Sequence, residues 1–438
     1  MTQGDQGAGH LSVGQGAALS IGAVLGTGVL TLPALAAAIA GPASLLSWLA
    51  LILLSLPMAG TFAALGARYP DAGGVSTYVR RAFGGRAAAM VGWCFYTAVP
   101  AAAPAAAMMA GRYVADALGG GRVTELATTA VLIGVVWALN AAGLRLSGRV
   151  QLALAAVLAA LMVLTVVVAI PHARPDAVGP LLPHGWGSVA SAAGLLVWAF
   201  AGWEAMSSLA AEYRDPARAV PRATAIALVT VGVLYLALAA TTILVLGAAA
   251  GDSAAPLSDL MALSIGPAAR PATALVAVLL TVGTMNTFFA GAAKLGAALA
   301  RDGALPAWFA AGSNAGQVPR RSLLIVGGGG LLSLAVCAAT GQDLTTIMLL
   351  ATSSFTTVYL LGSAAAVRLL PPGWARRGAA VAAAASVALA VSIGLPMLWP
   401  VGVSALAALY LALRRPSRGA GSEAGARDGE PDAEPGVV

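Results

Sequence analysis

Residues 20–33 are Ser20-Ile-Gly-Ala-Val-Leu-Gly-Thr-Gly-Val-Leu-Thr-Leu-Pro33, an apolar run interrupted by three glycines and by Thr27. A membrane helix satisfies its own backbone, whereas a break at Gly26-Thr27-Gly28 releases N–H and C=O groups that need another partner. A polar ligand or an ion bound at bilayer depth can be that partner. Small residues also permit close helix packing, which is the commoner reason for an isolated Gly-x-Gly in a membrane helix.

The composition of the whole chain indicates a polytopic membrane protein. Of its 438 residues, 59% are hydrophobic and 9% are charged, and the mean hydropathy is +0.87. A soluble core cannot bury this much apolar surface, and each crossing of the bilayer needs about 20 apolar residues. Twelve such runs are present, near 14–39, 43–67, 87–117, 125–143, 148–170, 190–211, 221–249, 270–299, 322–340, 344–369, 375–393 and 395–413.

The arginines predict the orientation of these spans, because cytoplasmic loops collect positive charge. With a cytoplasmic N-terminus, the outer loops and helix ends hold only four arginines: Arg112, Arg122, Arg174 and Arg270. The inner ones hold Arg68, Arg80, Arg81, Arg86, Arg145, Arg149, Arg214, Arg218, Arg222, Arg301, Arg320, Arg321, Arg368, Arg376, Arg377, Arg414, Arg415 and Arg418. We therefore expect both termini on the cytoplasmic side of the cell membrane. The net charge of +7 reflects this topology, and no basic stripe with interleaved aromatics indicates a nucleic-acid partner.

A second break lies in the sixth span, at Trp198-Ala-Phe-Ala-Gly-Trp-Glu204. Gly202 weakens the helix there, and Glu204 places an ionisable carboxyl inside an apolar run. A bare charge at that depth costs at least about 2.5 kcal/mol, so Glu204 is a functional candidate. Burial raises the pKa of a carboxyl, which suits a proton carrier. The alternative is a neutral, hydrogen-bonded Glu204 that only joins two helices.

The two breaks fall in the first and sixth spans, which predicts a repeat of five helices with a broken helix leading each half. Inverted-repeat transporters have this pattern, with the binding site at the repeat interface. The N–H groups after Gly28 suit a carboxylate, and carbonyls released at the breaks suit an ammonium group. A zwitterionic amino acid is the natural ligand, although other small ions also fit. The predicted division is an N-terminal tail (1–13), repeat one (about 14–170), repeat two (about 190–369), peripheral helices (about 375–413) and a disordered cytoplasmic tail (414–438).

The sequence offers little for other chemistry. The polar start of the chain, residues 1–10, has no cleavable signal, so we expect the first span to be retained. Cys94 and Cys337 fall singly within apolar spans, which is typical of small buried hydrophobes. The three histidines form no cluster with metal-ligand spacing, and no catalytic motif is present. We expect no metal site, no organic cofactor and no enzyme activity.

Several motifs, in order along the chain, resemble the amino acid-polyamine-organocation superfamily over roughly residues 12–413. They are Gly26-Thr-Gly-Val-Leu with Pro33, Arg68-Tyr-Pro-Asp-Ala-Gly-Gly-Val, Phe200-Ala-Gly-Trp-Glu, and Glu212-Tyr-Arg-Asp-Pro-Ala-Arg. Within the superfamily, Leu25-Gly-Thr-Gly-Val and Tyr69-Pro-x-Ala-Gly-Gly-Val are most similar to the bacterial exporter of methionine and branched-chain amino acids.

The resemblance implies an all-α, LeuT-like fold of ten core helices in two inverted halves, followed by two peripheral helices. It implies that Thr27 and Gly28 bind the substrate carboxylate, while carbonyls around 21–24 and 200–202 bind the ammonium group. The substrate-binding residues expected on this basis are Ile21, Gly22, Gly26, Thr27, Gly28, Phe200, Ala201 and Gly202. Trp198 corresponds to an aromatic gate, or else packs against lipid or a helix. Glu204 corresponds to a proposed proton-sensing carboxylate.

Selectivity must come from the rest of the pocket wall, for which the third, eighth and tenth spans offer uncharged residues: Pro100, Met285, Asn286 and the Thr352-Ser353 pair. A charged substrate would need a buried counter-charge, so a neutral, apolar amino acid fits better. The sequence thus predicts a transporter that moves such amino acids by alternating access. The predicted direction is export, and the predicted coupling ion is a proton or sodium. An uptake permease for amino acids or polyamines is the first alternative, and a membrane-embedded enzyme the second. The oligomeric state stays open.

Overall fold

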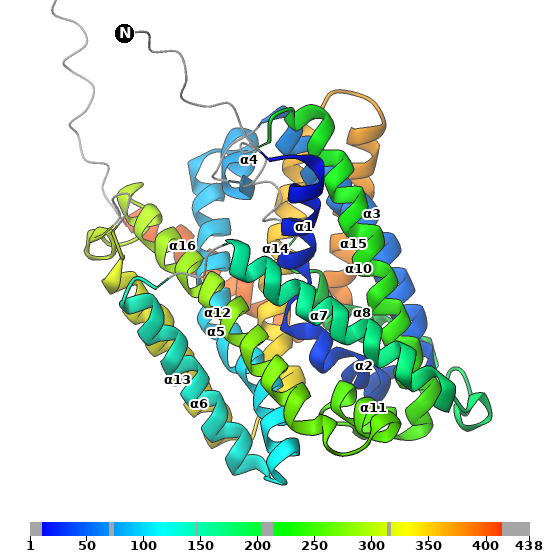
Figure 1. Cartoon of the computed structure of the whole chain (residues 1–438). Helices are drawn as coiled ribbons and strands as arrows, with labels where there is room; N and C mark the ends of the chain where they lie inside the picture. Colours follow the sequence, from blue (N-terminus) through cyan, green and yellow to red (C-terminus); the bar gives the residue numbers. More distant parts are fainter. Residues whose placement is uncertain (1–10, 70–73, 145–147, 203–212, 313–316, 414–438) are drawn as a thin grey trace, which may run out of the picture.

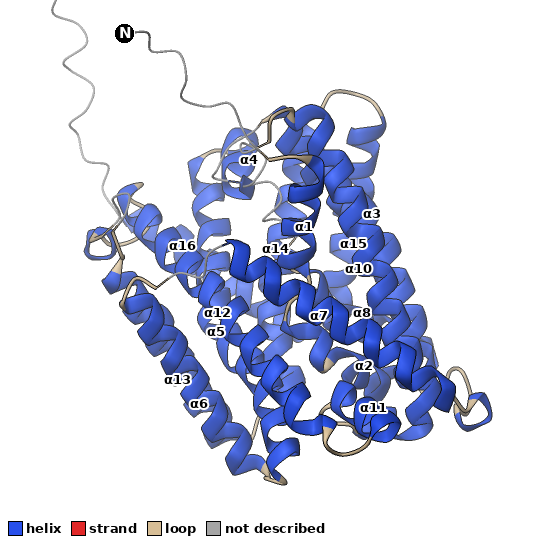
Figure 2. Cartoon of the chain, in the orientation of Figure 1, coloured by secondary structure: helices blue, strands red, loops and turns tan. Residues whose placement is uncertain are grey.

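The protein is all-α, as its hydrophobic composition predicts. A computed structural model describes residues 11–69, 74–144, 148–202, 213–312 and 317–413. In these ranges every regular element is a helix, and the only extended pairing is an isolated bridge between Leu11 and Tyr213 (Figure 2). Helices satisfy their own backbone hydrogen bonds, so this architecture suits a chain in hydrocarbon.

Ten stretches in the described ranges are long and apolar enough to cross a membrane, which makes the protein a multi-pass membrane protein. They comprise α3 (Ser44–Arg68) joined to the preceding short helices, α5 (Gly85–Leu118), α6 (Arg122–Ala141), α7 (Gly148–Ala169), α10 (Pro216–Leu246), α12 (Ala269–Arg301), α13 (Arg320–Thr340), α14 (Leu344–Leu369), α15 (Trp374–Ile393) and α16 (Leu398–Leu413). Each coincides with a predicted span. The predicted first span is instead divided into shorter helices, and the sixth is described only as far as Gly202, so the total of twelve and the inverted repeat stay predictions.

The first span is broken where the glycines predict a break. Helix α1 (Val13–Val24) begins at a capping box formed by Ser12 and Gln15, and it ends two residues before Gly26. Gly26 is extended, with φ −98° and ψ −166°. A short 3-10 helix, η1 (Thr27–Leu30), follows, and then α2 (Leu32–Ala40), which has a proline in its first turn.

The second break follows α8 (Gly185–Leu196) and the 3-10 helix η5 (Val197–Phe200). Ala201 is extended, with φ −64° and ψ 127°, and Gly202 has φ +133°, a conformation that L side chains rarely adopt. Glu204, the predicted proton-coupling residue, lies outside the described residues.

Two short helices lie between the predicted spans and were not expected. Helix α4 (Gly74–Phe83) buries Tyr78 and Val79 while Arg80 and Arg81 are exposed. Helix α11 (Pro256–Ile265) follows α10 on the opposite end of the bundle (Figure 1). Both are too short to be recognised as spans.

Helix α5 lies at the centre of the bundle. In its most apolar window 72% of the residues are buried, the largest share among the ten candidate spans. Its inner surface is built mainly from alanines, and it carries Pro100 and Pro104 within the helix. It contacts α6, α12, α13 and α14, and α6 and α13 lie side by side along one edge of the molecule (Figure 1).

Candidate functional site

The two breaks meet each other. A methyl group added at Gly202 would lie 2.7 Å from the carbonyl oxygen of Ala23 and 3.3 Å from the Cα of Val24. Only a glycine permits this approach, because any side chain would overlap the backbone at the end of α1. The first and sixth spans, far apart in the sequence, are thus in contact at their breaks.

The hydroxyls of buried tyrosines form hydrogen bonds with backbone carbonyls at the two breaks. The hydroxyl of Tyr235, on α10, lies 2.9 Å from the carbonyl oxygen of Val24 and 3.1 Å from that of Ala199, so it bridges both breaks. The hydroxyl of Tyr359, on α14, donates to the carbonyl of Phe200 at 3.1 Å. Both tyrosines are 2% exposed or less. The protein itself therefore satisfies backbone groups that would otherwise cost free energy in the membrane.

A third tyrosine links the first break to the end of the bundle where α11 lies. Tyr113, on α5, is 1% exposed and donates to the carbonyl of Leu30 at 2.6 Å. The same hydroxyl accepts a hydrogen bond from the N–H of Leu257, in α11, at 3.2 Å. Sequence reasoning missed all three tyrosines, although a phenol within an apolar span is a signal, since its hydroxyl needs a partner there.

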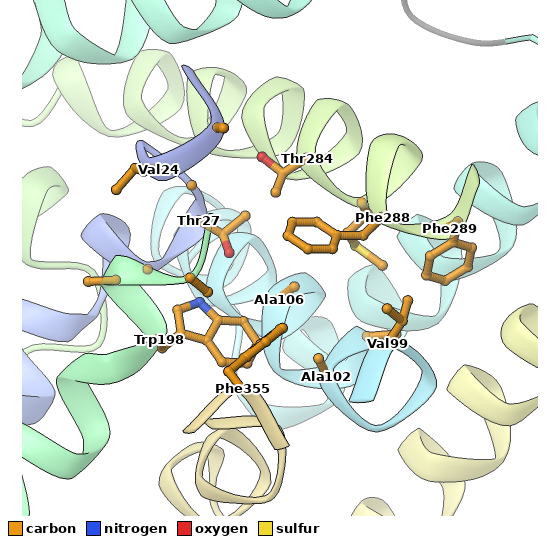
Figure 3. A pocket seen from close by; sticks show the side chains of 17 residues that line it. Val24, Thr27, Val99, Ala102, Ala106, Trp198, Thr284, Phe288, Phe289 and Phe355 are labelled. Atoms are coloured by element: carbon orange, nitrogen blue, oxygen red, sulfur yellow. The ribbon is translucent and has the colours of Figure 1, made fainter. Parts of the chain in front are cut away.

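A cavity lies between the breaks and α5, α12 and α14 (Figure 3). The empty space between these elements is about 620 Å³, counting space that opens to solvent. Its walls are formed by Ala23, Val24, Gly26, Thr27, Gly28, Val99, Ala102, Ala103, Ala106, Trp198, Ala199, Ala201, Thr284, Met285, Phe288, Phe289 and Phe355.

The chemistry of these walls is apolar and uncharged. The described lining residues include no charged side chain, and their polar side-chain groups are the hydroxyls of Thr27 and Thr284 and the indole N–H of Trp198. Phe288, on α12, and Phe355, on α14, project toward the cavity from the side opposite the first break (Figure 3). Such a cavity suits an apolar side chain, because Thr284 on α12 is the one hydroxyl that the described lining residues place away from the breaks.

Five of the predicted site residues line the cavity: Gly26, Thr27, Gly28, Trp198 and Ala201. Trp198 lies directly against Gly28, where an added methyl group would be 2.7 Å from the indole Cδ1. The indole therefore packs on the first break at a point where both line the cavity, and the glycine is needed for space. Whether Trp198 moves as a gate stays a prediction.

The other predicted residues that the structure describes lie around the breaks and are not among those that line the cavity. The backbone carbonyl of Ile21 accepts a hydrogen bond from the Leu25 N–H at 2.7 Å. Gly22 faces α7, where a methyl group would meet the Cβ of Ala155 at 3.3 Å. The Phe200 carbonyl accepts a hydrogen bond from the Tyr359 hydroxyl, and Gly202 lies against the end of α1.

Of the residues expected to set selectivity, only Met285 is among those that line the cavity. Pro100 faces α13, and the side-chain amide of Asn286 donates to the carbonyl of Leu144 at 3.3 Å. Thr352 and Ser353 donate to carbonyls of their own helix. The three expected helices do contribute to the walls, but apart from Met285 they do so through residues that were not predicted, because the helical phase of an almost uniformly apolar span is weakly marked in the sequence.

The described residues contain no group of three or more His, Cys, Asp or Glu side chains able to hold a metal ion. An all-α polytopic membrane protein with a cavity between two broken helices has the architecture of a membrane transporter. The chain belongs to the amino acid permease family, within the amino acid-polyamine-organocation superfamily, because the family model matches residues 11–413.

Among similar proteins, the uncharacterized amino acid permease YecA of Bacillus subtilis is 33% identical over 311 residues, covering 70% of this chain and 73% of YecA. The L-methionine/branched-chain amino acid exporter YjeH of Escherichia coli is 35% identical over 232 residues, covering 52% of this chain and 54% of YjeH. The branched-chain amino acid permease BcaP of Bacillus subtilis is 28% identical over 240 residues, covering 51% and 52%.

Proposed function

We propose that the protein is a secondary transporter that carries neutral, hydrophobic amino acids across the cytoplasmic membrane by alternating access. The observation that carries this proposal is the uncharged, apolar cavity between the two breaks. A basic, acidic or polyamine ligand would leave a charge unpaired against these walls, which is costly in a low-dielectric site.

The polar ends of the substrate would bind at the breaks. We assign the carboxylate to the N–H groups that begin η1, at Thr27 and Gly28, because η1 has no side-chain cap. We assign the ammonium group to the carbonyls of Ala23 and Ala201, two residues that line the cavity. The carbonyls of Val24 and Phe200 are less suitable, since each already accepts from a tyrosine.

The substrate side chain would extend toward Met285, Phe288 and Phe355. A branched or thioether side chain gains free energy there by leaving water, about 0.8 kcal/mol for each buried CH₂ group. YjeH is named as an exporter of methionine and branched-chain amino acids and BcaP as a branched-chain amino acid permease, which is consistent with this class of substrate.

The direction we propose is export, coupled to a proton through Glu204, with both termini in the cytoplasm. The likeness to YjeH supports export, and the excess of arginine in the predicted inner loops supports the orientation. The likeness to BcaP favours the second candidate, an uptake permease for branched-chain amino acids with the same cavity.

A transport screen in proteoliposomes tests the proposal. Leucine, isoleucine, valine and methionine should be transported faster than lysine, glutamate or putrescine. If transport is coupled to protons, reversing the direction of the proton gradient should change the transport rate. The Glu204→Gln variant should transport at a rate that no longer depends on pH. An unchanged pH profile in that variant would remove Glu204 from the mechanism, and selective movement of putrescine would refute the substrate class.

A further inference from the structure

Helix α13 contains four consecutive glycines, Gly327 to Gly330, in the middle of its length. A glycine within a helix is less favourable than alanine by about 1 kcal/mol, so a run of four is expected only where the helix needs close contacts. In membranes, such residues let neighbouring helices approach closely.

Three of the four glycines face neighbouring helices at very short range. A methyl group at Gly327 would lie 2.5 Å from the indole of Trp137, on α6. At Gly329 it would lie 3.0 Å from the Cβ of Pro100, on α5. At Gly330 it would lie 3.1 Å from the Cβ of Ala103, whereas Gly328 has nothing within 4 Å.

The residue in front of Gly330 belongs to the cavity wall. Ala103 lines the cavity, and so does Phe289, whose Cζ would be 3.9 Å from a methyl group at Gly330. A single layer of side chains therefore separates α13 from the candidate substrate site. Gly330 touches that layer from behind without lining the cavity itself.

We propose that Gly330, with Gly329 beside it, determines the largest substrate side chain that the cavity admits. The glycines let α13 lie close behind the α5 wall, so that Ala103 stays clear of the substrate. This inference rests on the proposed function, since it concerns the size limit for an apolar amino acid. Gly330 is a positioning residue that acts through Ala103 and Phe289.

An added methyl group behind this wall must displace one of its neighbours. A contact of 3.1 Å is tighter than nine in ten real Cβ contacts, so a shift of a few tenths of an ångström is required. The close fit of Gly327 beneath Trp137 holds α13 near α6, which favours displacement of Ala103 toward the cavity. One added or missing methylene group in an apolar pocket changes selectivity by about tenfold or more. A small displacement of Ala103 should therefore change substrate affinity measurably.

The experiment compares the binding of alanine, valine, leucine, methionine and phenylalanine to the purified full-length protein. In Gly330→Ala, affinity for methionine and phenylalanine should fall about tenfold relative to affinity for alanine. Gly328→Ala is the matched control, because it adds the same methyl group to the same helix where space is open, and its affinity ratios should equal those of the wild type.

The decisive variant adds a methyl group at position 330 and removes one at position 103. The double substitution Ala103→Gly with Gly330→Ala should restore the wild-type ratios, and Ala103→Gly alone should favour the larger amino acids. The single Ala103→Gly variant adds no atom, so it tests the wall even if Gly330→Ala does not fold. Equal ratios in wild type, Gly330→Ala and Ala103→Gly would overturn the inference. If the wild type binds none of the five amino acids, the proposed function fails and this inference falls with it.

Discussion

The two helix breaks use glycine for different reasons. In the first break Gly26 and Gly28 have ordinary negative φ angles, and the requirement at Gly28 is for space beside the indole of Trp198. In the second break Gly202 has φ +133°, and its Cα lies so close to the Ala23 carbonyl that a side chain is excluded. The first glycine pair therefore shapes the cavity, whereas Gly202 permits the fold.

The breaks are alike in how their backbone is satisfied. Tyr235 bridges the carbonyls of Val24 and Ala199, one from each break, and its ring packs edge-to-face on Trp48 and on Phe200, with centroids 5.4 and 5.6 Å apart. Both breaks are thus held by a side chain of the protein itself. A site built in this way is preorganised, which lowers the cost of ordering it around a substrate.

The largest expected effect is at the second break. Gly202→Ala combines an unfavourable backbone conformation, about 1–3 kcal/mol, with overpacking against the Ala23 carbonyl, another 1–3 kcal/mol. Together these terms should prevent accumulation of folded protein or lower its melting temperature by many degrees. Fluorescence-detected size-exclusion chromatography measures this directly. A stable, monodisperse Gly202→Ala protein would show that the second break does not depend on its glycine.

A smaller effect is expected where one side chain serves both breaks. Tyr235→Phe keeps the ring but removes the hydroxyl, leaving buried carbonyls short of a donor at a cost of about 1–3 kcal/mol. Thermal stability should fall, and affinity for methionine should fall with it, because both halves of the site lose their common support.

Tyr359→Phe is the matched comparison for Tyr235→Phe, since the Tyr359 hydroxyl donates to a carbonyl of the second break, that of Phe200. Its effect on stability should be similar in kind, but its effect on methionine affinity should be weaker. If the two variants lose equal affinity, the bridging position of Tyr235 has no special role in binding.

The breaks themselves were predictable, because glycine within an apolar run marks a place where a membrane helix cannot continue unaided. Gly26, Thr27 and Gly28 lie in the cavity wall where the sequence places them. The tyrosine partners were not predictable, since which hydroxyl reaches which carbonyl depends on how α5, α10 and α14 pack. For the same reason Phe288 and Phe355 were missed while Asn286, two residues from Phe288, was expected in their place.

The smallest effects should separate the two glycines of the first break. Gly28→Ala places a methyl group 2.7 Å from the Trp198 indole and 2.8 Å from the Leu32 side chain, which can both turn away without unfolding the protein. We expect normal folding with about a tenfold loss of affinity for methionine, equivalent to about 1.4 kcal/mol, because the displaced indole enters the cavity.

Gly26→Ala is the internal standard for that loss. A methyl group at Gly26 has no neighbour closer than 3.9 Å, and the extended backbone there is accessible to alanine. Its affinity, measured by isothermal titration calorimetry beside Gly28→Ala, should stay within about twofold of the wild type, a difference below 0.5 kcal/mol. A Gly28→Ala protein that also retained full affinity would mean that the first break serves helix packing alone. A Gly26→Ala protein that lost affinity would instead place a substrate atom directly against the Gly26 backbone, where there is room for one.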